Sequence, residues 1–273
     1  MPKLGENLSY KPKDIFDHSI KRAQHFLFLY DILHDTRCRN TRSDWAKKFK
    51  EFMHWPNNTK IIRIDGKDKN SILVLKNMGD IDRKHFTHVY ISELLRSSLV
   101  ASVSSLDRYI HDLIIYHSWR LLSKKEEEIP KGLREIRLPI LTTKKIIEVL
   151  RKNQRSRPGN TVKKALQKIL HRDYTFQTPS NIDKATKILG IKDFWRKIAR
   201  EMPGNPTPKD VREKLKKIAK RRNQIVHEAD LILKTKTKKI TVREIKRKDA
   251  QEALEFIKSF VEAFDKVILQ EFG

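Results

Sequence analysis

The chain of 273 residues is long enough to bury a sizeable core. Its eight glycines argue against a Gly-rich nucleotide-binding fold, and its single cysteine, Cys38, excludes an internal disulfide. Its 60 Lys and Arg against 34 Asp and Glu give a net charge of +26, which attracts polyanions such as nucleic acid, although a solvated basic surface is the plainer alternative. No signal peptide is visible and no apolar run approaches the ~20 residues that cross a bilayer, so we expect a cytoplasmic protein without a membrane contact.

The first 84 residues predict a helical extension that packs on the rest of the chain. A helix is expected from Asp14 to Leu33, because its apolar residues recur at helical spacing. These residues are Ile15, Phe16, Ile20, Ala23, Phe26, Leu27 and Tyr30. A short helix follows over Asp44–Phe52. The stretch Ile61–Leu75 alternates around Gly66, which predicts a small hairpin or a loop.

The longest helical pattern runs from His85 to Leu122 and opens a second region, residues 85–273. Pro130 and Gly132 then interrupt the chain within a basic insert, residues 124–172. Helices are predicted from Thr142 or Thr143 to Lys152, over Thr161–His171, over Ser180–Leu189 with a stop at Gly190, and over Asp193–Met202. The insert is expected to follow the backbone of a bound RNA through Arg151, Lys152, Arg155 and Arg157.

The last two helices complete an all-α chain. Thr207 is a favoured N-cap, Pro208 suits the first helical position, and Asp210 completes a capping box, so a helix should run through His227 to about Ala229. A basic, Thr-rich link from 234 to 248 leads to a final helix from about 249. Its expected core residues are Leu254, Ile257, Val261, Phe264 and Ile268.

Two charged residues fall on apolar helix faces, and their signs are opposite. Arg222 lies within the apolar stripe of the helix that begins at Pro208, and Asp107 lies within that of the long helix. A buried charge is costly unless it is paired. One interpretation is a buried Asp107–Arg222 pair that fixes helix register. The other is that Asp107 orients an arginine that contacts phosphate, with His111, four residues after Asp107, lining the same cleft.

A second pattern on the same helix indicates chemistry. Asn223 and His227 are four residues apart and share a face that Lys216 and Lys220 continue. Histidine moves protons near neutral pH, and arginine stabilises the charge that grows on a phosphate under attack. RNA supplies its own nucleophile, the 2′-hydroxyl. In an ideal helix Arg222 and His227 point about 140° apart, so pairing of two chains would bring two sets into one cleft.

The segment Arg221–His227 resembles the R-N-x-x-x-H form of the HEPN motif. The segments 105–111, 181–182, 188–191, 194–195 and 211–215 are similar to the RiboL-PSP-HEPN subfamily, so that the resemblance covers about residues 85–270. It implies a HEPN-type helical bundle that dimerises across the motif helices. It also implies RNA cleavage to a 2′,3′-cyclic phosphate, with Arg222 and His227 catalytic and Asn223 supporting.

The predicted function is therefore a metal-independent endoribonuclease without a cofactor, acting on RNA as a homodimer. Arg221 is expected to join Lys216 and Lys220 in RNA binding. A defence or toxin role implies an antitoxin or sensor protein as a partner. Two alternatives stay open at this point: a catalytically silent HEPN module that binds nucleic acid or docks a partner, and a purely structural role for Asp107, Arg222 and His227.

Overall fold

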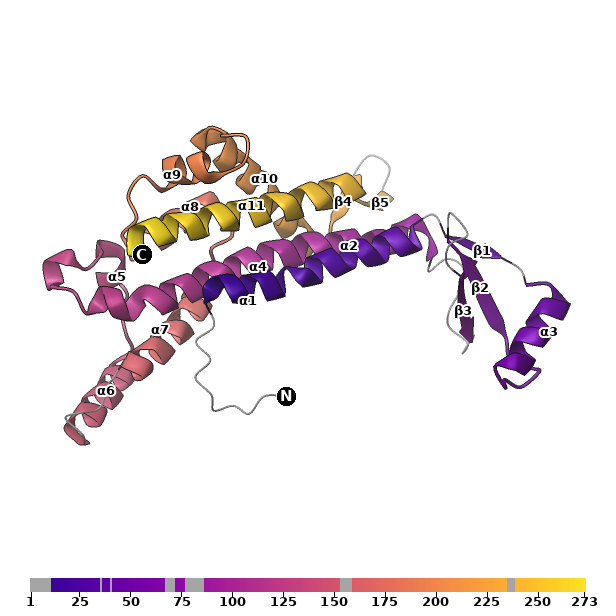
Figure 1. The fold of residues 1–273 in the computed structure, drawn as a ribbon, viewed down its shortest axis with the longest axis horizontal. Coiled ribbons are helices and arrows are strands. Elements are labelled where there is room, and N and C mark those ends of the chain that lie inside the picture. Colours follow the sequence, from indigo (N-terminus) through magenta and orange to yellow (C-terminus); the bar gives the residue numbers. More distant parts are fainter. Residues whose placement is uncertain are drawn as a thin grey trace.

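The computed structural model is a helical bundle with a small β-sheet at one end and a β-hairpin projecting from its side (Figure 1). It describes residues 11–34, 36–39, 41–66, 72–76, 86–152, 159–234 and 239–273. Within these residues, no helix combines the length and the apolar character that crossing a bilayer requires. The expected all-α bundle is confirmed, with two small strand groups added to it.

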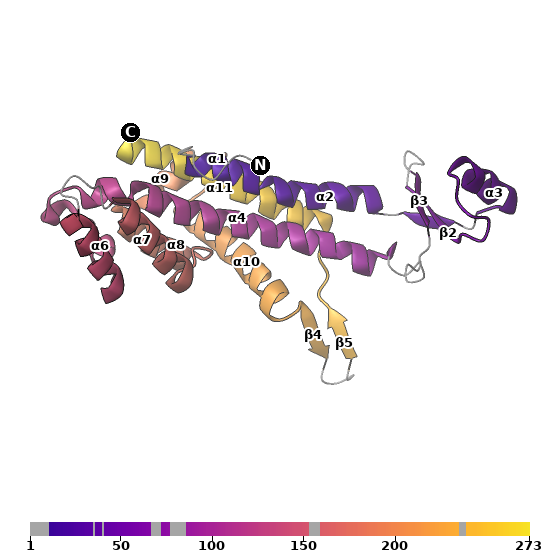
Figure 2. The same cartoon turned by 90° about the horizontal axis from the view of Figure 1, so that it is seen from below.

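The central element is α4 (His88–Leu122), a long helix without Pro or Gly. Helices α1 (Pro12–Ser19), α2 (Lys21–Leu33) and α11 (Arg247–Phe272) pack along it, and α10 (Pro208–His227) crosses it (Figures 1 and 2). Large apolar side chains from these helices fill the space around α4 and are almost completely buried: Phe16, Leu106, Tyr109, Ile110, Phe260 and Phe264. All five residues predicted for the core of the last helix are buried.

The N-terminal helical pattern forms two helices rather than one. Ile20 lies between α1 and α2, where the Ser19 hydroxyl donates to the carbonyl of Phe16 at 3.0 Å and competes with the helical ladder. The backbone at Ile20 stays close to helical values, so the two helices continue one apolar face. Most of the predicted face is buried against α4: Phe16, Ile20, Ala23, Leu27 and Tyr30.

A three-stranded antiparallel sheet lies beyond the N-terminal end of α4 (Figure 1). Its strands are β1 (Arg37–Arg39), β2 (Ile61–Asp65) and β3 (Ile72–Lys76), in that order, with Ile61 opposite Lys76 and Asp65 opposite Ile72. Of the two predictions for this stretch, the hairpin is therefore confirmed. The predicted short helix is α3 (Ser43–Phe52), which begins one residue earlier than expected.

The basic insert forms an arm that extends from the bundle (Figure 1). After a 3₁₀ turn, Glu126–Glu128, come α5 (Lys131–Arg134), α6 (Ile140–Lys152) and α7 (Gly159–Asp173). Helix α6 begins directly after Pro139, whose carbonyl accepts from the backbone of Thr142 and Thr143, so it starts before the predicted threonine cap. Helices α8 (Pro179–Leu189) and α9 (Phe194–Glu201) return to the bundle, and α8 ends at Gly190 with φ +76° as predicted.

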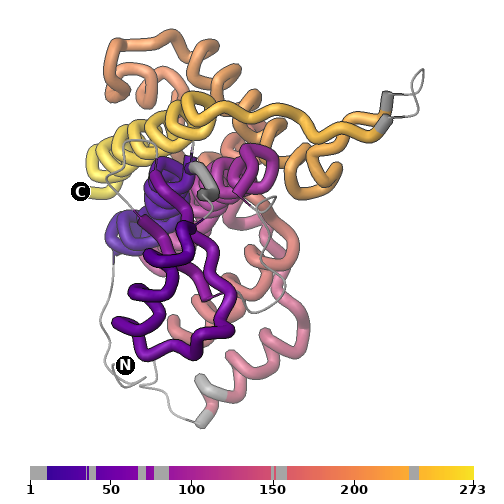
Figure 3. The backbone as a smooth tube through the Cα atoms, turned by 90° about the vertical axis from the view of Figure 1, so that its right-hand side faces the viewer, coloured from indigo at the N-terminus to yellow at the C-terminus, as the bar shows by residue number. Residues whose placement is uncertain are grey.

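The predicted basic link is instead a hairpin of β4 (Leu231–Lys234) and β5 (Lys239–Val242). On one face of the hairpin apolar residues meet across the strands, with Leu231 opposite Val242 and Leu233 opposite Ile240. The lysines and threonines that surround these short strands conceal them in the sequence. The hairpin and the α6–α7 arm extend from the bundle in different directions (Figure 3).

Candidate active site at the end of helix α10

Helix α10 is fixed at both ends, and the candidate residues lie at its C-terminal end. Its N-cap is the predicted one, because the Thr207 hydroxyl accepts from the backbone of Asp210 at 3.2 Å and the Asp210 carboxylate accepts from the backbone of Thr207 at 3.2 Å. Its apolar stripe is buried, including Val211, Leu215 and Ile218. His227 is its last residue.

The end of α10 brings Arg222, Asn223 and His227 together within one chain. The Arg222 Nη1 donates to Asn223 Oδ1 at 3.1 Å and lies 3.4 Å from His227 Nε2. Arg222 and His227 do leave the helix in different directions, but the long arginine side chain reaches the imidazole. Pairing of two chains is therefore not needed to assemble these three side chains, which corrects that part of the expectation.

The exposure of the three residues suits a substrate site. Asn223 and His227 are exposed, whereas Arg222 is half-buried and its Nε has no hydrogen-bond partner among the described residues. A guanidinium can only donate hydrogen bonds, so in this contact Nε2 of His227 takes the acceptor role. An anion placed here would meet the terminal nitrogens of the Arg222 guanidinium beside a proton acceptor.

The predicted Asp107–Arg222 pair is wrong. The Asp107 carboxylate accepts from the backbone N–H of Phe176 at 2.5 Å and from the Gln177 amide at 3.4 Å, so it ties α4 to the segment between α7 and α8. No ion pair joins it to Arg222 among the described residues. Arg222 needs no such partner, because it is only half-buried. Asp107 therefore neither orients Arg222 nor fixes the register of α4 against α10.

His111 is also not part of the site. Its side chain is 3% exposed and its ring nitrogens lie against two backbone carbonyls, Asp107 O at 2.8 Å and Leu170 O at 3.2 Å. Its ring stacks on His171, with the ring centroids 4.8 Å apart. The predicted supporting role for His111 is wrong, since the residue joins α4 to α7 inside the core.

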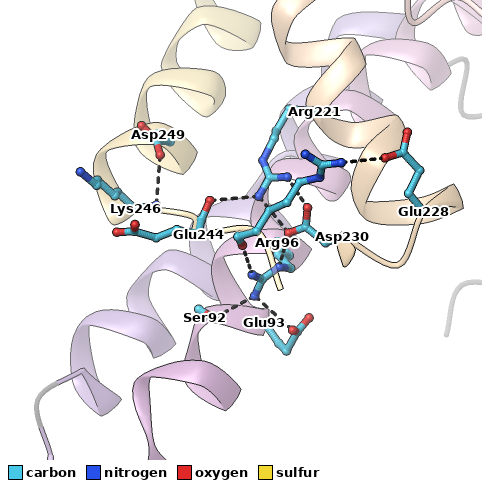
Figure 4. A network of polar contacts seen from close by, with 10 residues as sticks. Ser92, Glu93, Arg96, Arg221, Glu228, Asp230, Glu244, Lys246 and Asp249 are labelled. Atoms are coloured by element: carbon cyan, nitrogen blue, oxygen red, sulfur yellow. Dashed lines mark hydrogen bonds and ion pairs between the residues drawn. The ribbon is translucent and has the colours of Figure 1, made fainter. Parts of the chain in front are cut away.

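The buried ion pair of this region involves residues that the sequence analysis did not select (Figure 4). Arg96 of α4 is 5% exposed, and its Nε donates to the carboxylate of Asp230, 1% exposed, at 2.6 Å. Arg221 donates to both oxygens of the same carboxylate. Burial raises the pKa of Asp230, but the hydrogen bonds from Arg221 and Arg96 outweigh it and the pKa falls below its usual value.

This ion pair holds the turn that follows α10. Ala229 and Asp230 both have positive φ, +49° and +56°, and the Asp230 N–H donates to the carbonyl of Gln224 at 3.0 Å. Residues other than glycine are strained when their φ is positive, so this turn holds two strained residues in succession. Arg96 also donates to the carbonyl of Arg243 at 2.7 Å. Arg96 therefore joins α4 to the turn after α10 and to the segment between β5 and α11. His227 lies three residues before Asp230 and is positioned by this anchored turn.

The predicted RNA contacts fall in different surroundings. The guanidinium of Arg221 faces Asp230 and also donates to the carbonyl of Glu244 at 3.3 Å, so it is held inside the turn instead of facing a ligand. Lys216 and Lys220 are exposed on α10, and Arg151 is exposed near the end of α6. Lys152 ends α6, whereas Arg155 and Arg157 lie outside the described residues. In the described part of the chain, no group of three or more His, Cys, Asp or Glu residues is placed to hold a metal ion.

One sequence signal could have identified Arg96. It is the single charged residue between Glu93 and Asp107, a run otherwise made of apolar residues and serines. Such an isolated charge in the most apolar helix predicts a buried partner. Asp230, however, lies far away in the sequence and beyond a helix end, where periodicity gives no guide.

Comparison with known proteins places this site in a family. The model of the RiboL-PSP-HEPN family matches residues 66–270, which include α4, α10 and all but the last two residues of α11. No curated protein and no solved structure matches the chain. The match covers most of the chain and contains the whole of the Arg222–Asn223–His227 cluster. The chain therefore belongs to the RiboL-PSP-HEPN family.

Proposed function

We propose that this protein is a metal-independent endoribonuclease that acts on RNA in the cytoplasm. The observation that carries the proposal is the contact of Arg222 with both Asn223 and His227 on an exposed, basic helix end. This arrangement offers a proton acceptor and an anion-binding guanidinium within a few ångströms of each other. The family match supports an RNA-related activity for the domain that contains these residues.

The proposed reaction uses the substrate's own nucleophile. A phosphate that binds Arg222 would replace His227 Nε2 as its partner and free the Nε2 lone pair. His227 then takes the proton of the 2′-hydroxyl while the 2′-oxygen forms a bond to phosphorus and the bond from phosphorus to the 5′-oxygen breaks. The departing 5′-oxygen takes up a proton, so the products are a 2′,3′-cyclic phosphate and a 5′-hydroxyl. Arg222 stabilises the charge on the phosphoryl oxygens, and Asn223 orients Arg222.

A homodimer is part of this proposal. One imidazole cannot act as base and acid on one phosphate at the same moment, and His227 of a second copy could protonate the leaving oxygen. Beside the site, the hairpin presents an uncovered apolar face formed by Leu231, Leu233, Ile240 and Val242. An isolated two-stranded hairpin is only marginally stable in water. Light scattering of the wild type and of Leu233→Asp should show a dimer and a monomer, respectively, and a monomeric wild type would contradict this part.

The central test is RNA cleavage in the presence of EDTA by wild type, His227→Ala and Arg222→Ala. We expect the wild type to leave 2′,3′-cyclic phosphate ends. The loss of a general acid–base should reduce the rate about 10²–10⁴-fold. Removal of the charge that stabilises the transition state should reduce it about 10²–10³-fold. Circular dichroism would verify that both variants are folded.

Matched controls make the result specific. His18→Ala and Arg200→Ala remove an exposed histidine and an exposed arginine from other helices, and should cleave like the wild type. Cleavage that persists in His227→Ala would refute the assignment. Salt-dependent RNA binding without any cleavage would instead identify a catalytically silent binding module, the alternative function of the same surface.

The wider role we propose is in a defence or toxin system with a protein partner that restrains the enzyme. The support is the exposure of His227 and Asn223, because an open ribonuclease site endangers its own cell. Induced expression of wild type should arrest growth, whereas His227→Ala should not. Equal growth of the two strains, at equal protein levels, would contradict a toxic activity.

A further inference from the structure

A groove of about 450 Å³ lies along the seam of α2 and α4 and reaches α10. Helix α2 contributes Arg22 and Phe26, α4 contributes Ser97, Ser104 and Arg108, and α10 contributes Ile225. Figure 2 shows α2 and α4 side by side, with α10 crossing α4 on the side opposite to α2. The volume falls within the range of about 300–1,000 Å³ that is typical of ligand sites.

Half of the polar residues that line this groove carry hydrogen-bond donors without partners among the described residues. The others are Ser19, Arg96 and Ser105, which donate within the protein, and Glu93, which pairs with Arg96. Arg22 is exposed and has no ion pair among the described residues, and the hydroxyls of Ser97 and Ser104 make no hydrogen bond to other described residues. Arg108 uses its Nε to reach Asp112 at 2.7 Å, and its two terminal nitrogens have no hydrogen-bond partner in the described part of the chain. Phosphate and ribose oxygens are the ligands that such a set of donors would satisfy.

The groove also offers an apolar surface for a base. Phe26 is half-buried on one wall, and Val100 and Ile225 add aliphatic surface. Aromatic side chains beside basic groups are the usual platform for single-stranded nucleic acid, because every base can stack. Double-stranded RNA would not fit, since its bases face inward and its width exceeds that of a seam between two packed helices.

The groove adjoins the proposed active site through α10. Ile225 lies three residues after Arg222 and so shares its face of the helix, which points toward α4. Arg96, which anchors the turn beyond His227, lines the same groove. A strand whose phosphate is held by Arg222 could therefore continue directly into the groove.

We infer that this groove binds a nucleotide of single-stranded RNA adjacent to the cleaved phosphate, with Arg22 and Arg108 on phosphate and Phe26 against the base. The inference rests on the proposed function. It also gives the N-terminal helices a task, because α2 lies before the residues that the family model matches, and supplies one wall of the groove. RNA contact would then extend beyond the family domain.

The test measures RNA affinity in a chain that cannot cleave. In the His227→Ala background, Arg22→Ala, Phe26→Leu and Ser104→Trp would be titrated against a fluorescent single-stranded RNA of about 12 nucleotides. Arg22→Ala should lower the slope of log affinity against log salt by about 0.7, the value for one lost phosphate contact. Phe26→Leu and Ser104→Trp, which keep the net charge, should each weaken binding about tenfold.

Arg200→Ala and Ser123→Trp are the matched controls, since both residues are exposed and lie outside the groove. They should leave affinity and salt slope close to those of the parent. The inference is overturned if groove and control variants bind alike, or if the parent does not bind RNA. It is also overturned if light scattering shows that the groove variants change only the oligomeric state, because the groove would then belong to a contact between copies. Since nothing here depends on turnover, failure of the groove and failure of the cleavage assay remain separate results.

Discussion

At the scale of single residues, two adjacent arginines on α10 differ in how their loss should affect stability. Arg221 belongs to the buried carboxylate network of Asp230, whereas Arg222 has no carboxylate partner among the residues that the structure describes and is only half-buried. We expect Asp230→Ala to lower the free energy of unfolding by about 3–5 kcal/mol, because it removes the buried carboxylate that Arg96 and Arg221 share and leaves buried Arg96 with only the exposed Glu93, at 3.1 Å, as a counter-charge. Urea denaturation monitored by circular dichroism would measure the change.

The comparison variants for Asp230 are Glu228→Ala and Arg222→Ala. Glu228 pairs with Arg243 at 3.3 Å on the surface, and such a pair contributes about 0.5 kcal/mol or less. Arg222→Ala should likewise cost less than about 1 kcal/mol, the range of changes away from buried networks. A loss from Arg222→Ala as large as that from Asp230→Ala would mean that Arg222 is structural and would weaken its catalytic assignment.

A second residue-scale prediction concerns acid sensitivity. His117 is buried on α4, with its ring stacked on Phe272 at a centroid distance of 4.4 Å. Burial, and to a smaller extent the charge of Arg120, lower the pKa of His117 to about 4. Because the unfolded chain binds this proton near pH 6.5 and the folded chain does not, stability should fall as the pH drops from about 6.5 toward 4.

The size of that loss follows from the shift, at about 3 kcal/mol when the pH reaches 4. His117→Leu fills the buried position with an apolar side chain that does not titrate. Urea unfolding at pH 7 and at pH 4.5 should therefore show a smaller difference for His117→Leu than for the wild type. Parallel losses in the two proteins would exclude His117 as a source of acid sensitivity.

At the scale of elements, the close approach of α5 to α8 depends on one glycine. A Cβ at Gly132 would lie 2.7 Å from the carbonyl carbon of Lys187 and 2.8 Å from the backbone nitrogen of Ile188. Backbone atoms cannot move aside as a flexible side chain can, so Gly132→Ala should destabilise the protein by about 1–3 kcal/mol. Thermal unfolding would measure it, with exposed Lys131→Ala as the neutral control. Equal melting temperatures would show that the two helices can separate without cost.

The helices were the part of the fold that sequence periodicity could predict. Helix α10 was predicted from its cap to its last turn, because Thr207, Pro208 and Asp210 form a local signal that does not depend on tertiary structure. The β4–β5 hairpin was missed, since each of its strands has only four residues and lysines and threonines surround the apolar ones. Periodicity needs longer windows than such strands provide.

The candidate site was predictable in part for a related reason. Asn223 and His227 share a helix face, which local spacing determines, and the structure leaves both exposed there. The supporting contacts were not predictable, because helix phase alone cannot say which buried charge meets which. Asp107 was expected to pair with Arg222 but accepts from the backbone of Phe176, and Arg96 pairs with Asp230 through a turn of unusual backbone geometry.

At the scale of the whole molecule, the N-terminal helices share one core with the family domain. The family match begins at residue 66, yet α1 and α2 lie before it and bury their apolar face on α4. Phe16 is 1% exposed and packs edge-on against Tyr109, whose hydroxyl donates to Asp265 of α11 at 3.2 Å. A change at Phe16 should thus reach helices from both ends of the chain.

We therefore expect Phe16→Ala to lower the free energy of unfolding by about 3–5 kcal/mol, the usual cost of a large aromatic truncated in a core. The chain supplies a matched control in Phe28, which is 61% exposed on α2, and Phe28→Ala should change stability by about 0.5 kcal/mol or less. Calorimetry would show whether Phe16→Ala moves the whole transition or splits it in two. A single shifted transition means that residues before 66 are integral to the folded domain, so α2 can hold a fixed wall beside α10. An early, separate transition would mean that α1 and α2 dock as an independent unit, and any RNA contact through Arg22 would then depend on that docking.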